Sequence, residues 1–186
     1  MKLGKKLGAG LAAIGSLLLI AAPAGATTAS ATLTAGSLGF ASTPGNVTFG
    51  SVALNGQNLS VTASQPLDIA DATGSGAGWS VTATSTLFTS GSHTLPVGAT
   101  TISSAPAAAT CDTGVTCTPA GSNSVSYPYS LPAAATAPSA TKLFTAASGT
   151  GMGDQTITPT WNLAIPGNAY AGNYTSTWTL SLVSGP

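Results

Sequence analysis

A strand-like alternation near the end of the chain constrains its fold more than any other feature. From Trp178 to Leu182, apolar residues take every second position, and Thr or Ser takes the positions between. This period of two is typical of a β-strand with one buried face. Residues 79–84 repeat the pattern in the first half of the chain, again starting with a tryptophan. Two such strands with hydroxyl-rich outer faces favour an extracellular β-sandwich.

Further strand patterns fill the rest of the chain, with Gly, Pro and Asn turns between them. Asn55-Gly56, set between two alternating runs, is a strong hairpin signal. No window keeps a helical period, so the sequence predicts an all-β fold: a single antiparallel β-sandwich, Greek-key-like. We expect its strands at 32–40, 46–54, 59–63, 67–71, 79–84, 100–103, 124–129, 156–165 and 173–183.

Residues 104–138 differ in composition and are rich in Ala, Pro, Thr and Ser, so we expect a long loop or insertion there. The segment holds both cysteines, Cys111 and Cys117. In a secreted chain this close spacing predicts one local disulfide. A ring of this size stabilises by only about 2 kcal/mol in the chain-entropy treatment, so it pins the loop and does not hold the fold. Two thiols with no nearby histidine do not make a zinc site, and we expect no metal and no cofactor.

The first 26 residues have the layout of a secretory signal peptide. Lys2, Lys5 and Lys6 form a basic start, an apolar stretch follows from Leu7, and Ala-Gly-Ala at 24–26 supplies the small residues of a cleavage site. A membrane-spanning helix is disfavoured because the apolar stretch is short and interrupted. We expect cleavage after Ala26, with 29–31 as the alternative site. The mature domain would then span 27–186, secreted and extracellular, at the cell wall or cell surface.

Removal of the signal leaves a mature chain almost without charge. One lysine, Lys142, stands against four aspartates, which gives a net charge of −3. So few cations cannot neutralise phosphates, so we do not expect nucleic acid or anionic lipid as electrostatic partners. A glycan or protein partner must be held by hydrogen bonds and apolar contacts.

Catalytic chemistry has little support in the sequence. His93 is the single histidine and lies in a polar turn, where we expect an exposed loop residue, and the chain has no Arg and no Glu. No Gly-x-Ser-x-Gly elbow accompanies a base and an orienting acid. Asp68 and Asp71, three apart, could act as an acid–base pair or bind calcium, but turn capping is the favoured interpretation. We therefore predict no catalytic residues and no enzyme activity.

Aromatic side chains are better candidates for binding, because their rings can stack on sugar faces. Tryptophans in alternating strands are expected to point inward and pack. Tyrosines that flank turns are expected to be exposed, and these are the candidate glycan contacts: Tyr127, Tyr129 and Tyr170.

The tryptophan strands also carry a family resemblance. Trp178-Thr179-Leu180 follows the approach Ala-Gly-Asn-Tyr-Thr at 171–175, and a related triplet, Trp79-Ser80-Val81, lies midway with Val in place of Leu. Trp161-Asn162-Leu163 matches the same three-letter pattern. This paired placement resembles the WxL-domain proteins of Gram-positive bacterial surfaces. The resemblance implies a β-rich domain that binds peptidoglycan noncovalently and acts in surface complexes. We expect the motif residues themselves to be structural: Trp79, Ser80, Val81, Trp178, Thr179 and Leu180.

Two functions from different classes follow. The first is a secreted cell-wall module that binds peptidoglycan or another wall glycan without a covalent link. The second is a structural subunit of a surface layer, fibre or adhesin, because an uncharged Thr/Ser surface and terminal strands suit pairing between copies or with other surface proteins. We expect no nucleic-acid partner and no transmembrane segment after signal cleavage.

The first prediction concerns export. Because the small residues at 24–26 fit signal peptidase, the exported protein should begin at Thr27. N-terminal sequencing of secreted material checks this. Exported protein that keeps Met1 and stays embedded in the membrane would contradict it.

Overall fold

The computed structural model describes residues 27–121 and 123–186, so the predicted signal peptide at 1–26 lies outside the described residues. In these residues the chain forms fourteen strands and no helix, which confirms the all-β prediction. No helix of this part is long and apolar enough to cross a membrane. The compact unit spans Thr34–Pro186. In the other unit, the described residues 27–33 are exposed and have no regular secondary structure.

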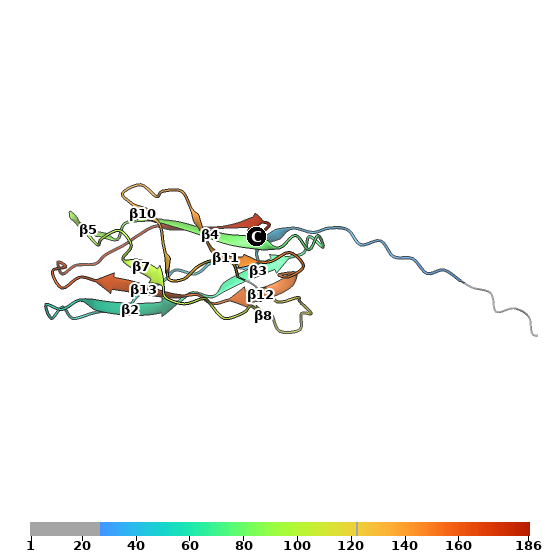
Figure 1. Cartoon of the computed structure of the whole chain (residues 1–186), viewed down its shortest axis with the longest axis horizontal. Coiled ribbons are helices and arrows are strands. Elements are labelled where there is room, and N and C mark those ends of the chain that lie inside the picture. The colour runs from blue at the N-terminus through green and yellow to red at the C-terminus, as the bar shows by residue number, and fades with distance from the viewer. Residues whose placement is uncertain (1–26, 122) are drawn as a thin grey trace, which may run out of the picture. The chain divides into compact units, whose positions relative to one another are not determined.

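The first sheet is built around β4 (Trp79–Thr86). β14 (Trp178–Ser184) runs antiparallel to β4 over all seven of its residues, from the pair Trp178–Ser85 to the pair Ser184–Trp79. On the other side of β4 lie β11 (Thr141–Ala146), antiparallel, and β10 (Ala133–Ala134), parallel. A bulge interrupts β11 between Lys142 and Phe144. In the view of Figure 1 this sheet forms the upper layer of the domain.

The second layer is a long antiparallel pair of chain segments, each bent once. β3 (Leu67–Asp71) pairs with β12 (Gly153–Ile157), and β2 (Leu59–Ser64) pairs with β13 (Thr160–Ile165). The register is the same on both sides of the bend, and the hydrogen bond from Gln65 N–H to Pro159 C=O (3.0 Å) continues it. Pro159 has no N–H to donate, so the single strand predicted at 156–165 is divided there.

Short strands complete this layer. β1 (Leu38–Phe40) pairs with β3, and β8 (Thr110–Cys111) pairs with β12. β7 (Thr100–Ile102) joins β13 to β9 (Tyr129–Ser130). β5 (Thr89–Ser90) and β6 (His93–Thr94) form a separate hairpin, which a bridge between Thr89 and Thr175 links to the segment before β14. The predicted antiparallel sandwich is thus present, with one parallel pairing at β10.

Fully buried tryptophans form the centre of the core between the layers. Trp79 and Trp161 are both fully buried and pack with Ile69, Val81 and Phe144. Each indole N–H has a partner: Trp79 donates to Gly151 C=O and Trp161 donates to Gln65 Oε1, both at 2.9 Å. Position 151 must be glycine, because a Cβ there would lie 2.5 Å from Trp79 Nε1.

The strand expected at 46–54 does not form. The pairing of β1 with β3 ends at the hydrogen bond from Ala41 N–H to Asp68 C=O. The chain then bends before Pro44. Val47 and Phe49 of this segment still pack against the core. The alternating pattern therefore buries these two side chains, although the backbone of the segment pairs with no described strand. The 44–54 stretch is called the unpaired segment below.

Other predicted strands are shorter than expected. Only Leu38–Phe40 forms from 32–40, only Tyr129–Ser130 forms near 124–129, and the last strand begins at Trp178 and not at 173. The loop predicted at 104–138 contains three short strands and buries Ala109, Ala120 and Leu131 in or against the core. The predicted disulfide between Cys111 and Cys117 is present, with a Cα–Cα distance of 5.5 Å.

The second prediction concerns Trp161. Trp161→Ala removes a fully buried ring and should destabilise the domain by about 3–5 kcal/mol. Trp161→Phe keeps most of the volume but leaves Gln65 Oε1 without its donor, and should destabilise by about 1–3 kcal/mol. Urea unfolding followed by circular dichroism measures both. An unfolding midpoint that stays at the wild-type value in Trp161→Ala would show that this ring is not part of the core.

Candidate functional site

An open groove lies between β14 of the first sheet and β2 and β13 of the second. Its volume is about 950 Å³, within the range of ligand sites. The unpaired segment forms one wall, and residues 169–178 with Phe88 and Leu95 form much of the rest. None of the described residues that line it is Asp, Glu, Lys or Arg. The groove is therefore suited to a ligand recognised through hydrogen bonds and apolar contacts.

Trp178 connects the core to the floor of this groove. Its ring centroid lies 4.8 Å from that of Trp161, 6.3 Å from that of Phe88 and 6.5 Å from that of Phe49. The edge-on geometry of the Trp161 and Phe88 contacts is the favoured arrangement of aromatic pairs. The Trp178 indole N–H donates to Ser176 Oγ at 3.0 Å. The ring is half-buried, so it is first a packing group and second a part of the groove lining.

The two motif tryptophans are therefore not equivalent. The sequence predicts both rings inward, in facing or adjacent sheets. The structure places both in one sheet, at opposite ends of the β4–β14 pair. Trp79 is fully buried and Trp178 half-buried, and only Trp178 reaches the groove.

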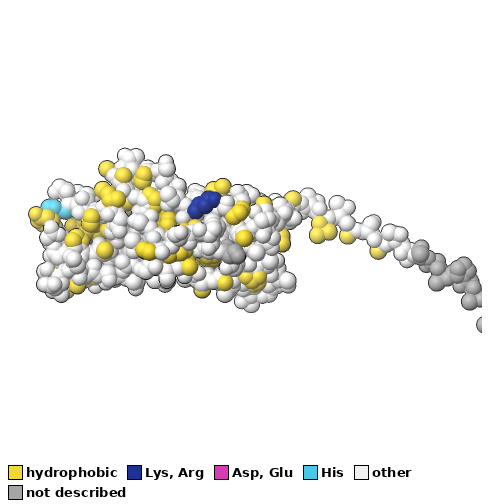
Figure 2. Space-filling model, in the orientation of Figure 1, with side chains coloured by type: hydrophobic (Ala, Val, Ile, Leu, Met, Phe, Trp, Pro, Cys, Tyr) yellow, Lys and Arg dark blue, Asp and Glu magenta, His cyan; other side chains and the backbone are white. Residues whose placement is uncertain are grey.

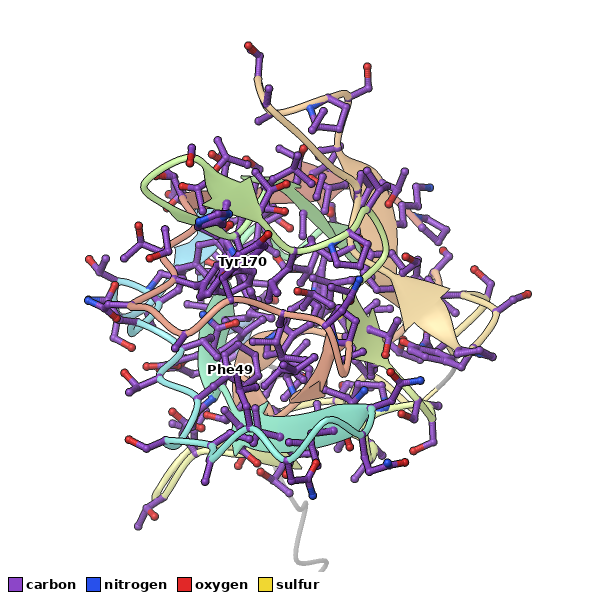
Figure 3. All side chains as sticks on the ribbon, turned by 90° about the vertical axis from the view of Figure 1, so that its left-hand side faces the viewer. Phe49 and Tyr170 are labelled. Carbon is purple, nitrogen blue, oxygen red and sulfur yellow. A yellow bond between two sulfur atoms is a disulfide. The ribbon has the colours of Figure 1, made fainter. Side chains whose placement is uncertain are left out.

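Tyr170 is the most exposed aromatic side chain at this site. It is 63 % exposed and stacks on His93, with ring centroids 3.7 Å apart and an angle of 12° between the rings. Tyr174 OH donates to Tyr170 C=O at 3.0 Å and anchors the backbone there. Figure 3 looks onto this end of the domain and shows Tyr170 above Phe49 of the unpaired segment. His93 is thus half-buried in a stack on β6 and is not the exposed loop residue expected from the sequence.

Tyr127 and Tyr129, the other candidate glycan contacts, are not exposed. Tyr129 is only 7 % exposed, and Tyr127 is half-buried with its hydroxyl bonded to Leu143 C=O. Burial raises the pKa of both phenols. Both tyrosines are buried because the 104–138 loop folds back on β11. The sequence pattern does not reveal this packing. Of the three predicted tyrosines, the structure leaves only Tyr170 accessible to a glycan.

A cluster of three carboxyl groups lies elsewhere in the second layer. Asp68 of β3, Asp154 of β12 and Asp112 of the disulfide loop each bring an oxygen within 4.8 Å of the others. Asp68 Oδ1 and Asp154 Oδ1 are buried and have no hydrogen-bond partner among the described residues, whereas Asp112 Oδ1 accepts from Thr156 Oγ1 at 3.0 Å. Burial raises the pKa of Asp154, and the charges of Asp68 and Asp112 raise it further. Carboxyl groups this close can share a proton or hold a hard cation.

Sequence reasoning missed this cluster because it paired Asp68 with Asp71. Residues three apart on a strand point to opposite faces. Asp71 Oδ1 accepts from Thr73 N–H at 3.0 Å and Thr73 Oγ1 at 2.7 Å, as turn capping predicts. Asp112 reaches the cluster only through the position of the disulfide loop beside β12, where its N–H donates to Asp154 C=O at 3.1 Å. No local sequence signal links these residues.

Comparison with known proteins returns no match for this chain: no family model, no curated protein and no solved structure. The resemblance to WxL-domain proteins stays a prediction carried by the motifs.

The third prediction concerns Asp154. Because its pKa is raised in the folded state, the folded protein binds a proton more readily than the unfolded chain between the ordinary and the raised pKa. Stability should therefore fall as pH rises through that window. Asp154→Asn removes the repulsion, so it should raise Tm at pH 7 and flatten the dependence of Tm on pH.

Asp71→Asn is the comparison variant, since its carboxylate already has two donors and should lose stability on substitution. Thermal unfolding from pH 3 to 8 measures both. An Asp154→Asn variant that is less stable than wild type at pH 7 would contradict the account of this cluster.

Proposed function

We propose that the protein is a secreted surface protein that binds peptidoglycan or another wall glycan noncovalently, in the groove beside β14. The observation that carries the proposal is the combination of exposed and half-exposed aromatic rings with an uncharged groove. Sugars offer apolar ring faces and many hydroxyls. A site with aromatic faces and neutral hydrogen-bonding groups matches both.

The Tyr170 end of the groove has the features of a sugar-stacking site. Stacking on His93 covers one face of the Tyr170 ring and fixes its orientation before a ligand arrives. A fixed ring loses less conformational entropy on binding than a free one. Asn173 and Thr175 line the groove nearby and are exposed, so their amide and hydroxyl groups can bond to sugar hydroxyls.

In this proposal the Trp-x-Leu motif organises the site without being its main contact. Trp178 holds Phe49 and Phe88 in place, and Leu180 lies on the same inward face of β14. The ligand contacts come from the neighbouring loop at 169–175. The motif residues Trp178 and Leu180 would thus have a structural role, which is to position the groove.

A second candidate function is a structural subunit of a surface assembly. The observation that favours it is that β14, a seven-residue strand without a charged side chain, pairs on one side only among the residues that the structure describes. This edge of β14 does not include Tyr170.

The fourth prediction tests glycan binding. Tyr170→Ala should weaken retention on purified peptidoglycan about tenfold, which corresponds to about 1.4 kcal/mol, without changing Tm. Tyr170→Phe keeps the ring and should bind like wild type. Trp178→Ala should lose binding and stability together, because it removes a packed ring. Tyr170→Ala retained as well as wild type would exclude this end of the groove as the glycan site.

A further inference from the structure

We propose that copies of this protein assemble by strand addition. Residues 29–35 of one copy pair with the free side of β14 in the next. The inference does not depend on glycan contacts at Tyr170, although Trp178 and Leu180 line both the groove and the proposed pairing site. It begins from two complementary features. One is a sheet edge that pairs with no described strand, although β1 lies near it. The other is a strand-like sequence pattern that belongs to no sheet.

The acceptor is defined by the backbone of β14. At the two ends of its ladder with β4, Thr86 N–H donates to Thr177 C=O and Gly185 N–H donates to Gly78 C=O, both at 2.9 Å. Bonded and non-bonded positions alternate along an antiparallel pair, so the odd-numbered residues of β14 bond to β4. The even-numbered residues direct their N–H and C=O groups to the other side, where no described strand pairs with them. These groups form the free edge: Trp178, Leu180, Leu182 and Ser184.

The opposite edge of the same sheet, formed by β10 and β11, has features that prevent pairing with another strand, and the free edge of β14 does not. β11 carries Lys142, the single described lysine, next to a bulge, and β10 lies between Pro132 and Pro138. Charges, bulges and prolines are the usual devices that prevent pairing between sheet edges. β14 has none of these and keeps one register over its seven residues. Its outer face is Thr179, Ser181 and Val183, and Val183 is 49 % exposed.

The donor is the exposed stretch before β1. Ala29, Ala31, Leu33 and Ala35 alternate with Ser30, Thr32 and Thr34, which is the pattern of a half-buried strand. Yet all these residues are exposed, and Leu33 is 91 % exposed. A large apolar side chain at that exposure, within a strand pattern, indicates a surface that becomes covered on association.

Length, charge and side-chain size fit this donor to the edge. At about 3.3 Å per residue, seven donor residues span the same length as the seven of β14. Neither strand carries a charge. Pairing places Ala29, Ala31 and Leu33 on the inward face beside Leu180 and Leu182, where the groove leaves space next to Trp178 and Leu180. Figure 1 shows β14 running toward the C-terminus, away from the β5–β6 hairpin that carries His93.

The symmetry of such a contact determines its product. The donor of one copy and the edge of another are different surfaces, so the contact is heterologous and each copy keeps one donor and one acceptor available. Such a contact propagates into linear chains of copies when the rotation between copies does not close a ring.

The fifth prediction tests the assembly with the exported protein. Light scattering after size exclusion, with electron microscopy, should show oligomers that grow with concentration. Leu33→Lys should lower the oligomer fraction at least tenfold, because it places a charge on the packed face. Thr32→Lys, on the opposite face of the same segment, should assemble like wild type and is the matched control.

Cross-linking locates the acceptor. Both native cysteines are in the disulfide, so an introduced cysteine supplies the single free thiol. A Thr32→Cys chain mixed with a Ser181→Cys chain should give a disulfide-linked dimer, and mixing with Lys142→Cys should not. A monomer at all concentrations, assembly that survives Leu33→Lys, or equal linkage at position 142 would each overturn the proposal. Tyr170→Ala should assemble normally, so a failure of glycan binding and a failure of assembly remain distinguishable.

Discussion

The ladder between β4 and β14 joins residues almost a hundred positions apart, and both parts of the proposed function depend on it. Its hydrogen bonds run from Thr86 and Thr177 at one end to Gly78 and Gly185 at the other without a register shift. This fixed register places Trp178 at the end where Trp161, Phe88 and Phe49 meet. A shift of one residue would turn the Trp178, Leu180 and Leu182 side chains to the solvent face, and the groove would lose its floor.

The groove exists because the strand predicted at 46–54 does not form. The chain leaves the sheet after Ala41, so the unpaired segment does not pair with β2. Side chains line the space between β2 and β14, but no backbone hydrogen bonds bridge it. Val47 and Phe49 pack against the core from this side. The described residues that line the groove are uncharged. Figure 2 shows apolar side chains scattered over the face in view, with little cationic surface. Such a surface suits neutral glycans and other copies of the chain better than charged partners.

Features set by local sequence could be predicted, and features set by long-range packing could not. Alternation gave the strands that contain Trp79, Trp161 and Trp178, and the short spacing of Cys111 and Cys117 gave the disulfide. The positions of Tyr127 and Tyr129 depend on how a loop folds onto β11, and the Asp68, Asp112 and Asp154 cluster depends on three separate segments. The predicted strand at 46–54 has the right pattern but lacks backbone partners, because the chain bends before Pro44, after its pairing with β3, and does not continue along β2. Periodicity indicates which face is buried and not which neighbour supplies the hydrogen bonds.

Amide hydrogen exchange along β14, measured residue by residue by NMR on dilute protein, tests the central claim most directly. If β14 is bonded on one side only, the N–H groups of Thr179, Ser181 and Val183 should be protected, and those of Leu180, Leu182 and Ser184 should exchange at least tenfold faster. At concentrations where copies associate, the fast group should become protected as well. Uniform protection of all six in dilute protein would show that the edge is already occupied, and uniformly fast exchange would show that the β4–β14 ladder is not a stable part of the fold.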